Sequence, residues 1–226
     1  MRNWMLGLAA VFVVAFGLTR VARTEGVAVP SPAVDAPLAA PGAPNKVAVV
    51  AGGCFWGVQA VYQHVRGVKK AVSGYAGGAE NTAHYEMVGT GRTGHAESVQ
   101  IFYDPAVVSY GQLLRVFFSV AHDPTTLNRQ GPDDGPQYRS AIFFQDAEQE
   151  KIARAYIAQL DQAHVFRKPI VTAVTKLPAF YEAEDYHQDY ATLHPRDAYI
   201  MINDAPKVAN LRTIFPDLYV EPGKRR

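Results

Sequence analysis

The chain has 226 residues, of which 48% are hydrophobic and 19% are charged, values typical of a soluble globular protein with one core of ordinary size. Its formal net charge is +1, because 22 lysines and arginines nearly cancel 21 aspartates and glutamates. This balance gives no electrostatic reason to expect a nucleic acid or an anionic surface as the partner. A small or neutral substrate is favoured instead.

The first 23 residues differ in composition from the rest of the chain. An apolar run from Trp4 to Leu18 lies between one arginine on its amino-terminal side and two on its carboxyl-terminal side. The run has the length of a signal-peptide core and is short for a bilayer-spanning helix, which needs roughly 20 apolar residues. We therefore expect an exported, periplasmic protein. No clear cleavage site follows, so a cleaved signal peptide and an uncleaved membrane anchor both stay open.

Residues 24–45 are rich in proline and alanine and have no periodic apolar face. This composition is typical of an extended linker. The catalytic domain is then expected over residues 46–226, ending in a basic tail at Gly223 to Arg226.

The domain shows alternating strand and helix patterns. Ser109 with Gln112, and Asp146 with Gln149, have the spacing of helix starts with mutual capping. The predicted elements are a strand at 46–50, a helix from Cys54 to Gly67, strands at 70–75 and 97–103, a helix at 109–120, a strand at 138–144, a helix at 146–160 and a strand at 170–175. This order predicts an α/β two-layer sandwich, with a ferredoxin-like core of mixed sheet and helices packed on it. The polar loop at 122–137 is long enough to be functional.

Cys54 is the only cysteine, so an internal disulfide is impossible. The thiol is a buried core group, an intermolecular partner or a reactive group. Gly52 and Gly53 precede it and the predicted helix follows, so no side chain competes there for the free backbone N–H groups. Such a helix start lowers a cysteine pKa from about 8.5 to roughly 3.5–7.5, which favours the reactive reading. A lipid-bearing cysteine is rejected, because the apolar run ends far upstream at Leu18.

Three further residues near the thiol or on the strands carry chemical information. Phe55 and Trp56 directly follow Cys54, and at least one of these rings should stay beside the sulfur, where it could hold an S-methyl group. In the strand 97–103, the period of two places Glu97 on the side of the apolar residues. Desolvation there would raise the carboxyl pKa to about 6 or 7, the range used for general-acid catalysis. The alternative is that Glu97, as the first strand residue, reaches solvent.

Several motifs, taken in order, closely resemble peptide methionine sulfoxide reductase A (MsrA). They are GCFWG at 53–57, Tyr85 within HYEMV, GHAE at 94–97, DPTTLNRQGPDDGPQYRSAI at 123–142 and AEDYHQDY at 183–190. The resemblance covers Lys46 to about His194, essentially the whole domain.

The resemblance implies a role for each matching position. Cys54 would attack the sulfoxide sulfur, Glu97 would give a proton to the sulfoxide oxygen, and the hydroxyls of Tyr85 and Tyr138 would bind that oxygen. Phe55 and Trp56 would hold the methyl group, with Asp133 supporting the site from the long loop. Members of the family reduce the S epimer of methionine sulfoxide, free or in protein, and leave a cysteine sulfenic acid. No cofactor or metal is expected.

The chain departs from a common family pattern because no cysteine follows Cys54. Many members use later cysteines to convert the sulfenic acid to a disulfide. We therefore expect an external thiol reductant, such as thioredoxin, glutaredoxin with a small thiol or an exported donor. The domain itself is expected to be monomeric.

Two other readings compete with the reductase. The first is a cysteine hydrolase with His84, His95 or His187 as base, and the second is a module that binds oxidised methionine without catalysis. His187 stands beside Tyr186 and Tyr190 in a late helix, either close to the site or, as we expect, on the solvated face of that helix.

Overall fold

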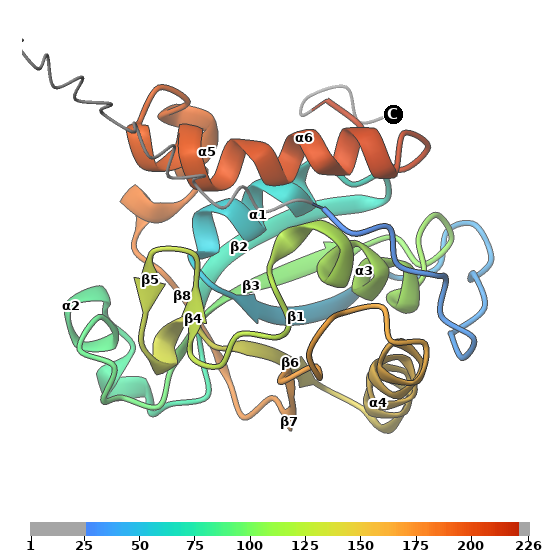
Figure 1. Ribbon diagram of the computed structural model, residues 1–226, viewed down its shortest axis with the longest axis horizontal. Coiled ribbons are helices and arrows are strands. Elements are labelled where there is room, and N and C mark those ends of the chain that lie inside the picture. The colour runs from blue at the N-terminus through green and yellow to red at the C-terminus, as the bar shows by residue number, and fades with distance from the viewer. Residues whose placement is uncertain (1–25, 222–226) are drawn as a thin grey trace, which may run out of the picture.

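The computed structural model describes residues 26–221 (Figure 1). The predicted signal or anchor segment and the basic tail lie outside the described residues. Within 26–221, no helix combines the length and the apolarity that crossing a bilayer requires.

A six-stranded mixed sheet forms the centre of the molecule, in the order β7-β6-β1-β3-β2-β8. Its strands are β1 (Lys46–Gly52), β2 (Val68–Ala76), β3 (Ala96–Tyr103), β6 (Ser140–Phe144), β7 (Ala173–Lys176) and β8 (Phe180–Glu182). The inner strands β6-β1-β3-β2 are antiparallel and, with the helices between them, form the predicted ferredoxin-like core. β7 is parallel to β6, and β8 is antiparallel to β2.

Helices on the sheet and around it complete an α/β fold, as predicted. They are α1 (Phe55–Gln63), α2 (Tyr85–Val88), α3 (Tyr110–Val116), α4 (Ala147–Gln162), α5 (Tyr190–Leu193) and α6 (Ala205–Ile214). Figure 1 shows α6 lying along α1 on the side away from the sheet. Two predicted helix starts are confirmed: Ser109 and Gln112 cap each other before α3, and Asp146 accepts from the Gln149 amide at α4.

Alternate side chains of β3 point toward the helices. Val99, Ile101 and Tyr103 are buried in the main core with residues of α1, α3 and α4. A smaller apolar cluster, which includes Val49 and Phe143, lies on the other face of the sheet. The strand therefore carries Glu97 toward the helix layer, on the side predicted from its period of two.

Some element boundaries differ from the predicted ones. The strand predicted from Tyr138 begins at Ser140, because Pro136–Tyr138 forms a 3₁₀ turn. The loop at 122–137 contains a small hairpin of β4 (Arg129–Gln130) and β5 (Asp133–Asp134). The late helix predicted at 183–190 is a 3₁₀ turn, Asp185–His187, followed by α5. Asp189 separates these two turns and has a left-handed backbone, with φ 57°, which interrupts a continuous helix.

Residues 26–45 contain no helix or strand, yet they pack on the domain as a strap. Val29 is 1% exposed and belongs to the main core. The Tyr156 hydroxyl donates to the Pro30 carbonyl at 2.6 Å. Asp35 accepts from the Ser109 hydroxyl, and from the Gly111 amide at 2.7 Å, at the start of α3. Regular secondary structure therefore begins at Lys46, but residues before it already pack against the domain.

We expect Asp35→Ala to lower the free energy of unfolding by about 1–2 kcal/mol, because two donors at the start of α3 lose a carboxylate acceptor. Chemical unfolding followed by circular dichroism measures this change. Asp217→Ala, at an exposed position, is the control and should change stability by less than about 0.5 kcal/mol. Equal stability of the two variants would show that Asp35 does not fasten the strap.

Candidate active site

Cys54 lies where β1 turns into α1. Gly53 has φ 87°, a left-handed conformation that favours glycine, and a side chain there would collide with Gln130 of the β4–β5 hairpin. The turn delivers Cys54 to the N-cap position of α1, with 7% of its surface exposed. Gly53 thus allows the hairpin to pack closely over the start of the helix.

The first two amides of α1 act on two ionisable side chains. The Phe55 N–H donates to Glu97 Oε2 at 3.0 Å, and the Trp56 N–H lowers the pKa of the Cys54 thiol. Helix-start amides have no partner within the helix and so are available for such acceptors. The carboxyl predicted as general acid and the thiol predicted as nucleophile therefore meet at one helix start.

Glu97 is 4% exposed, so the alternative that its carboxyl reaches solvent is excluded. Burial raises the pKa of Glu97 to about 8, against the lowering effect of the Phe55 amide. Asp133 and Asp204 raise it further. At neutral pH the carboxyl is protonated and can donate a proton, as predicted from its place on the strand.

The predicted lowering of the Cys54 pKa is wrong for this structure. Burial is the largest effect and raises the pKa of the thiol well above its usual value, and Glu97 and Asp204 act in the same direction. The Trp56 amide and the Lys207 ammonium lower it by less. The helix start is present as expected, but desolvation of the thiolate outweighs it.

Tyr85 and Tyr138 approach the same site from α2 and from the 3₁₀ turn Pro136–Tyr138. Burial, followed by Glu97, raises the pKa of both hydroxyls, and Cys54 also contributes to both. The two hydroxyls thus stay protonated and are available as hydrogen-bond donors near the thiol and the carboxyl. The structure brings together all four residues predicted as catalytic.

Phe55 and Trp56 divide the roles expected of them. Phe55 is buried in the core, with its ring 5.9 Å from that of Tyr75 between centroids. Trp56 is half-buried and stacks on Tyr190 at 3.9 Å, with the edge of Tyr199 at 6.0 Å. One ring is therefore core and the other remains partly accessible beside the sulfur.

His187 is not on a solvated helix face, as the sequence had suggested. It is 2% exposed, and its Nδ1 accepts from the indole N–H of Trp56 at 3.2 Å. Its ring also packs against Phe55, Tyr85 and Tyr186. Because the indole N–H can only donate, Nδ1 must be unprotonated, and burial keeps the pKa of His187 below its usual value. His187 thereby fixes the orientation of the Trp56 ring.

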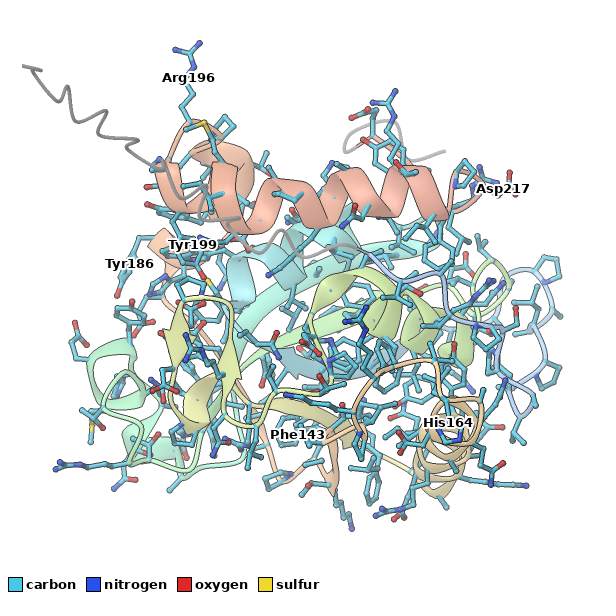
Figure 2. All side chains as sticks on the ribbon, in the orientation of Figure 1. Phe143, His164, Tyr186, Arg196, Tyr199 and Asp217 are labelled. Carbon is cyan, nitrogen blue, oxygen red and sulfur yellow. The ribbon has the colours of Figure 1, made fainter. Side chains whose placement is uncertain are left out.

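Asp133 acts through Tyr199, a residue that the sequence analysis did not single out. The Tyr199 hydroxyl donates to Asp133 Oδ2, which joins the β4–β5 hairpin to the π-helical turn Ile200–Asp204. Figure 2 shows Tyr186 and Tyr199 at the same end of the molecule. Nothing in the local pattern around Tyr199 distinguishes it from the other eleven tyrosines.

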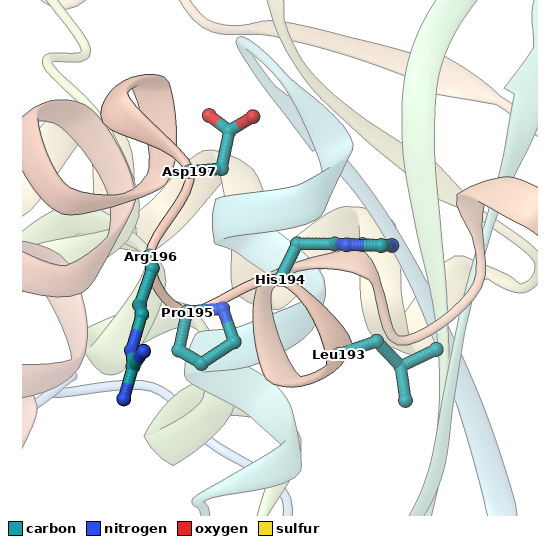
Figure 3. Close-up of a pocket in the computed structure, with 5 residues that line it drawn as sticks. All are labelled: Leu193, His194, Pro195, Arg196 and Asp197. Carbon is teal, nitrogen blue, oxygen red and sulfur yellow. The ribbon is translucent and has the colours of Figure 1, made fainter.

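A surface hollow of about 450 Å³ lies beside these aromatic residues and is lined by residues 193–197 (Figure 3). Asp197 accepts from the Tyr199 amide at 2.8 Å and from the Tyr190 hydroxyl at 3.4 Å. The loop therefore positions the two tyrosines that pack on Trp56, and Cys54 is not among the residues lining the hollow.

The alternative hypothesis of a cysteine hydrolase lacks a histidine that could act as the base for Cys54. The ring of His95 bonds to the Gly78 amide and the Ala79 carbonyl, His84 is exposed, and His187 bonds to Trp56. None of these histidines is among the groups that influence ionisation of Cys54. Over residues 26–221 there is also no cluster of three or more histidine, cysteine or acidic side chains arranged to hold a metal.

Comparison with known proteins gives a consistent picture. Residues 46–218 match the family model described as peptide methionine sulfoxide reductase. A relative from Mesorhizobium japonicum, named peptide methionine sulfoxide reductase MsrA 2, is 62% identical over 81% of this chain and 93% of its own length. A second of the same name, from Synechocystis, is 50% identical over 84% of this chain and 89% of its own.

Solved structures agree with the sequence relatives. Reduced Mxr1 from Saccharomyces cerevisiae has a TM-score of 0.63 and 32% identity, covering 72% of this chain and 92% of that one. Methionine sulfoxide reductase A of Corynebacterium diphtheriae has a TM-score of 0.58 and 32% identity, covering 78% and 92%.

We expect the stability of the native chain to fall, relative to Glu97→Gln, as pH rises from 5 to 8. The unfolded chain loses the Glu97 proton near pH 4.3, whereas the native chain keeps it until about pH 8, so the native state binds more protons over this window. The amide variant cannot titrate and keeps an acceptor for the Phe55 N–H. Chemical unfolding at each pH should show a relative loss of about 2–4 kcal/mol that levels off above pH 8. Glu182→Gln, at an exposed carboxyl, is the control. A constant difference across the window would contradict a buried, protonated Glu97.

Proposed function

Because the chain belongs to the peptide methionine sulfoxide reductase family and is a reductase of methionine sulfoxide, we propose that Cys54 performs the reaction as a nucleophile and passes through a sulfenic acid. The observation that carries this proposal is the shared helix start, where the amide of Phe55 holds Glu97 beside the thiol. The neutral carboxyl, the thiol and two tyrosine hydroxyls supply the groups that the reaction needs.

The proposed step transfers one oxygen atom and two electrons. The Cys54 sulfur attacks the sulfoxide sulfur and forms a transient S–S bond, while Glu97 gives its proton to the sulfoxide oxygen. The S–O bond of the substrate and the transient S–S bond then break as the hydroxyl is transferred to Cys54. The thiol proton replaces the proton that Glu97 gave. Thiol and sulfoxide thus become sulfenic acid and thioether, with the cysteine sulfur oxidised and the methionine sulfur reduced.

Proton delivery is the demanding part of this step, because an unprotonated oxygen leaves sulfur poorly. A Glu97 pKa of about 8 supports delivery at neutral pH, since the carboxyl still carries its proton. The hydroxyls of Tyr85 and Tyr138 would stabilise the charge that develops on the oxygen. The high pKa of the Cys54 thiol means that the attacking thiolate must form within the complex, as its proton leaves.

Substrate, recycling and location complete the proposal. The substrate would be the S epimer of methionine sulfoxide, free or in oxidised proteins, with its methyl group against Phe55 and Trp56. The single cysteine supports recycling by an external thiol such as thioredoxin, because the sulfenic acid has no second thiol in the chain. The amino-terminal apolar run supports export to the periplasm, with the protein either free or membrane-anchored. There the enzyme would act as a monomer that repairs oxidative damage.

We expect one equivalent of a methionine-S-sulfoxide peptide, without reductant, to give one equivalent of methionine peptide and one added oxygen at Cys54. Mass spectrometry with and without a sulfenic acid trap measures both products. Cys54→Ser should give neither. Turnover by Cys54→Ser, or activity confined to the R epimer, would overturn the proposal.

We expect Tyr85→Phe and Tyr138→Phe each to slow single-turnover reduction by about 10²-fold, because each removes one donor to the developing oxyanion. Substrate affinity should change little, since these bonds strengthen in the transition state. Tyr219→Phe is the matched control, because that hydroxyl donates to Glu221 near the end of the described chain. Rates within twofold of the unmodified enzyme would remove the tyrosines from the mechanism.

A further inference from the structure

Lys207 is the only lysine or arginine between residues 26 and 221 whose side chain is buried. It is 7% exposed, and its Nζ lies 3.0 Å from Oδ1 of Asp204, which has no exposed surface. A buried ion pair adds little stability compared with apolar side chains of similar size, because both ions lose their hydration. Stability alone therefore does not account for a lysine at this position.

The Asp204–Lys207 pair lies against the first turn of α1. A Cβ atom at Gly57 would overlap Asp204 Oδ1 and would lie 2.8 Å from Lys207 Nζ, so the missing side chain of Gly57 is what admits the pair. Gly57 is three residues after Cys54, and positions three apart share a helix face. The ammonium is thus held one helical turn from the reactive thiol.

Among residues 26–221, the other ionisable groups that influence the ionisation of Cys54, or are influenced by it, are neutral or acidic. Two of them act on the ionisation of the thiol, Glu97 from β3 and Asp204 from the turn before α6. The tyrosines coupled to the thiol are Tyr85, Tyr138, Tyr190 and Tyr199. Lys207 is the one cation in this set, and it also acts on Asp133. Lys207 is therefore the group in this set that offsets negative charge, while the adjacent Asp204 has a larger effect of opposite sign on the thiol.

We propose that Lys207 is a positioning residue of the reductase, whose buried ammonium, held by Asp204 in the space left by Gly57, favours the thiolate of Cys54 during attack. The inference rests on the proposed function, which makes Cys54 the nucleophile. Lys207 does not touch the substrate; it acts through the sulfur, by offsetting part of the cost of placing a negative charge in a buried site.

The lone cysteine provides a direct test, because every alkylation event in the full-length protein reports on Cys54. The rate of iodoacetamide labelling is measured against pH for the unmodified protein and for Lys207→Met, which keeps side-chain length and removes the charge. We expect the midpoint of the profile to move upward and the rate at pH 7 to fall at least about threefold, since each unit of pKa changes the thiolate fraction tenfold. Lys46→Met, which breaks an exposed pair with Glu148 at the far end of β1, is the control and should leave the profile unchanged.

Lys207→Met leaves Asp204 without its partner and could prevent folding. In that case the same comparison is made between Asp204→Asn and the double variant Asp204→Asn/Lys207→Met, in which no acid is stranded. The double variant is expected to have the higher midpoint. Whichever of the two comparisons is made between folded proteins, equal midpoints of the labelling profile would overturn the proposal. The assay contains no sulfoxide, so this outcome is distinct from a failure of the reductase mechanism, which Cys54→Ser tests separately.

Discussion

The hydrogen bond from the Phe55 amide to the Glu97 carboxyl is the interaction on which the site depends. It ties β3, a central strand of the sheet, to the first residue of α1, directly after Cys54. The ferredoxin-like order of strands makes this meeting possible, because β1 and β3 are neighbours and β1 leads directly into α1. One backbone donor thus sets the distance between an acid and a nucleophile that are 43 positions apart in the chain.

Exclusion of water gives this arrangement its chemical character. Burial raises the pKa of Glu97, of Cys54 and of the tyrosines around them, so the site holds protons that would be lost in solvent. Such a site is suited to a reaction in which a proton must be delivered to oxygen as a bond breaks. The same burial makes the thiolate costly, which is why a nearby ammonium is significant.

The sequence was most informative where local rules apply. The period of two in β3 predicted the side on which Glu97 lies, and the Ser109–Gln112 spacing predicted the start of α3. The direction of the Cys54 pKa was predicted wrongly, because a helix start is visible in the sequence whereas depth of burial depends on the hairpin and α6 packed over it. His187 and Tyr199 gave no local signal. A 3₁₀ turn brings His187 to Trp56 from a segment that was expected to be a helix. Tyr199 reaches Trp56 from the start of a π-helical turn, in a segment to which no element was assigned. Tyr85 and Tyr138 were identified only through the family resemblance.

The absent side chain at Gly57 also constrains how this enzyme can change over generations. Any larger residue there would meet Asp204 and Lys207, so the three positions are coupled and their substitutions should not be additive. A lineage could gain a bulkier residue in the helix only after the acid and the base had been replaced by smaller groups. Until then, even an alanine at this position, a substitution that most helices tolerate, would collide with Asp204.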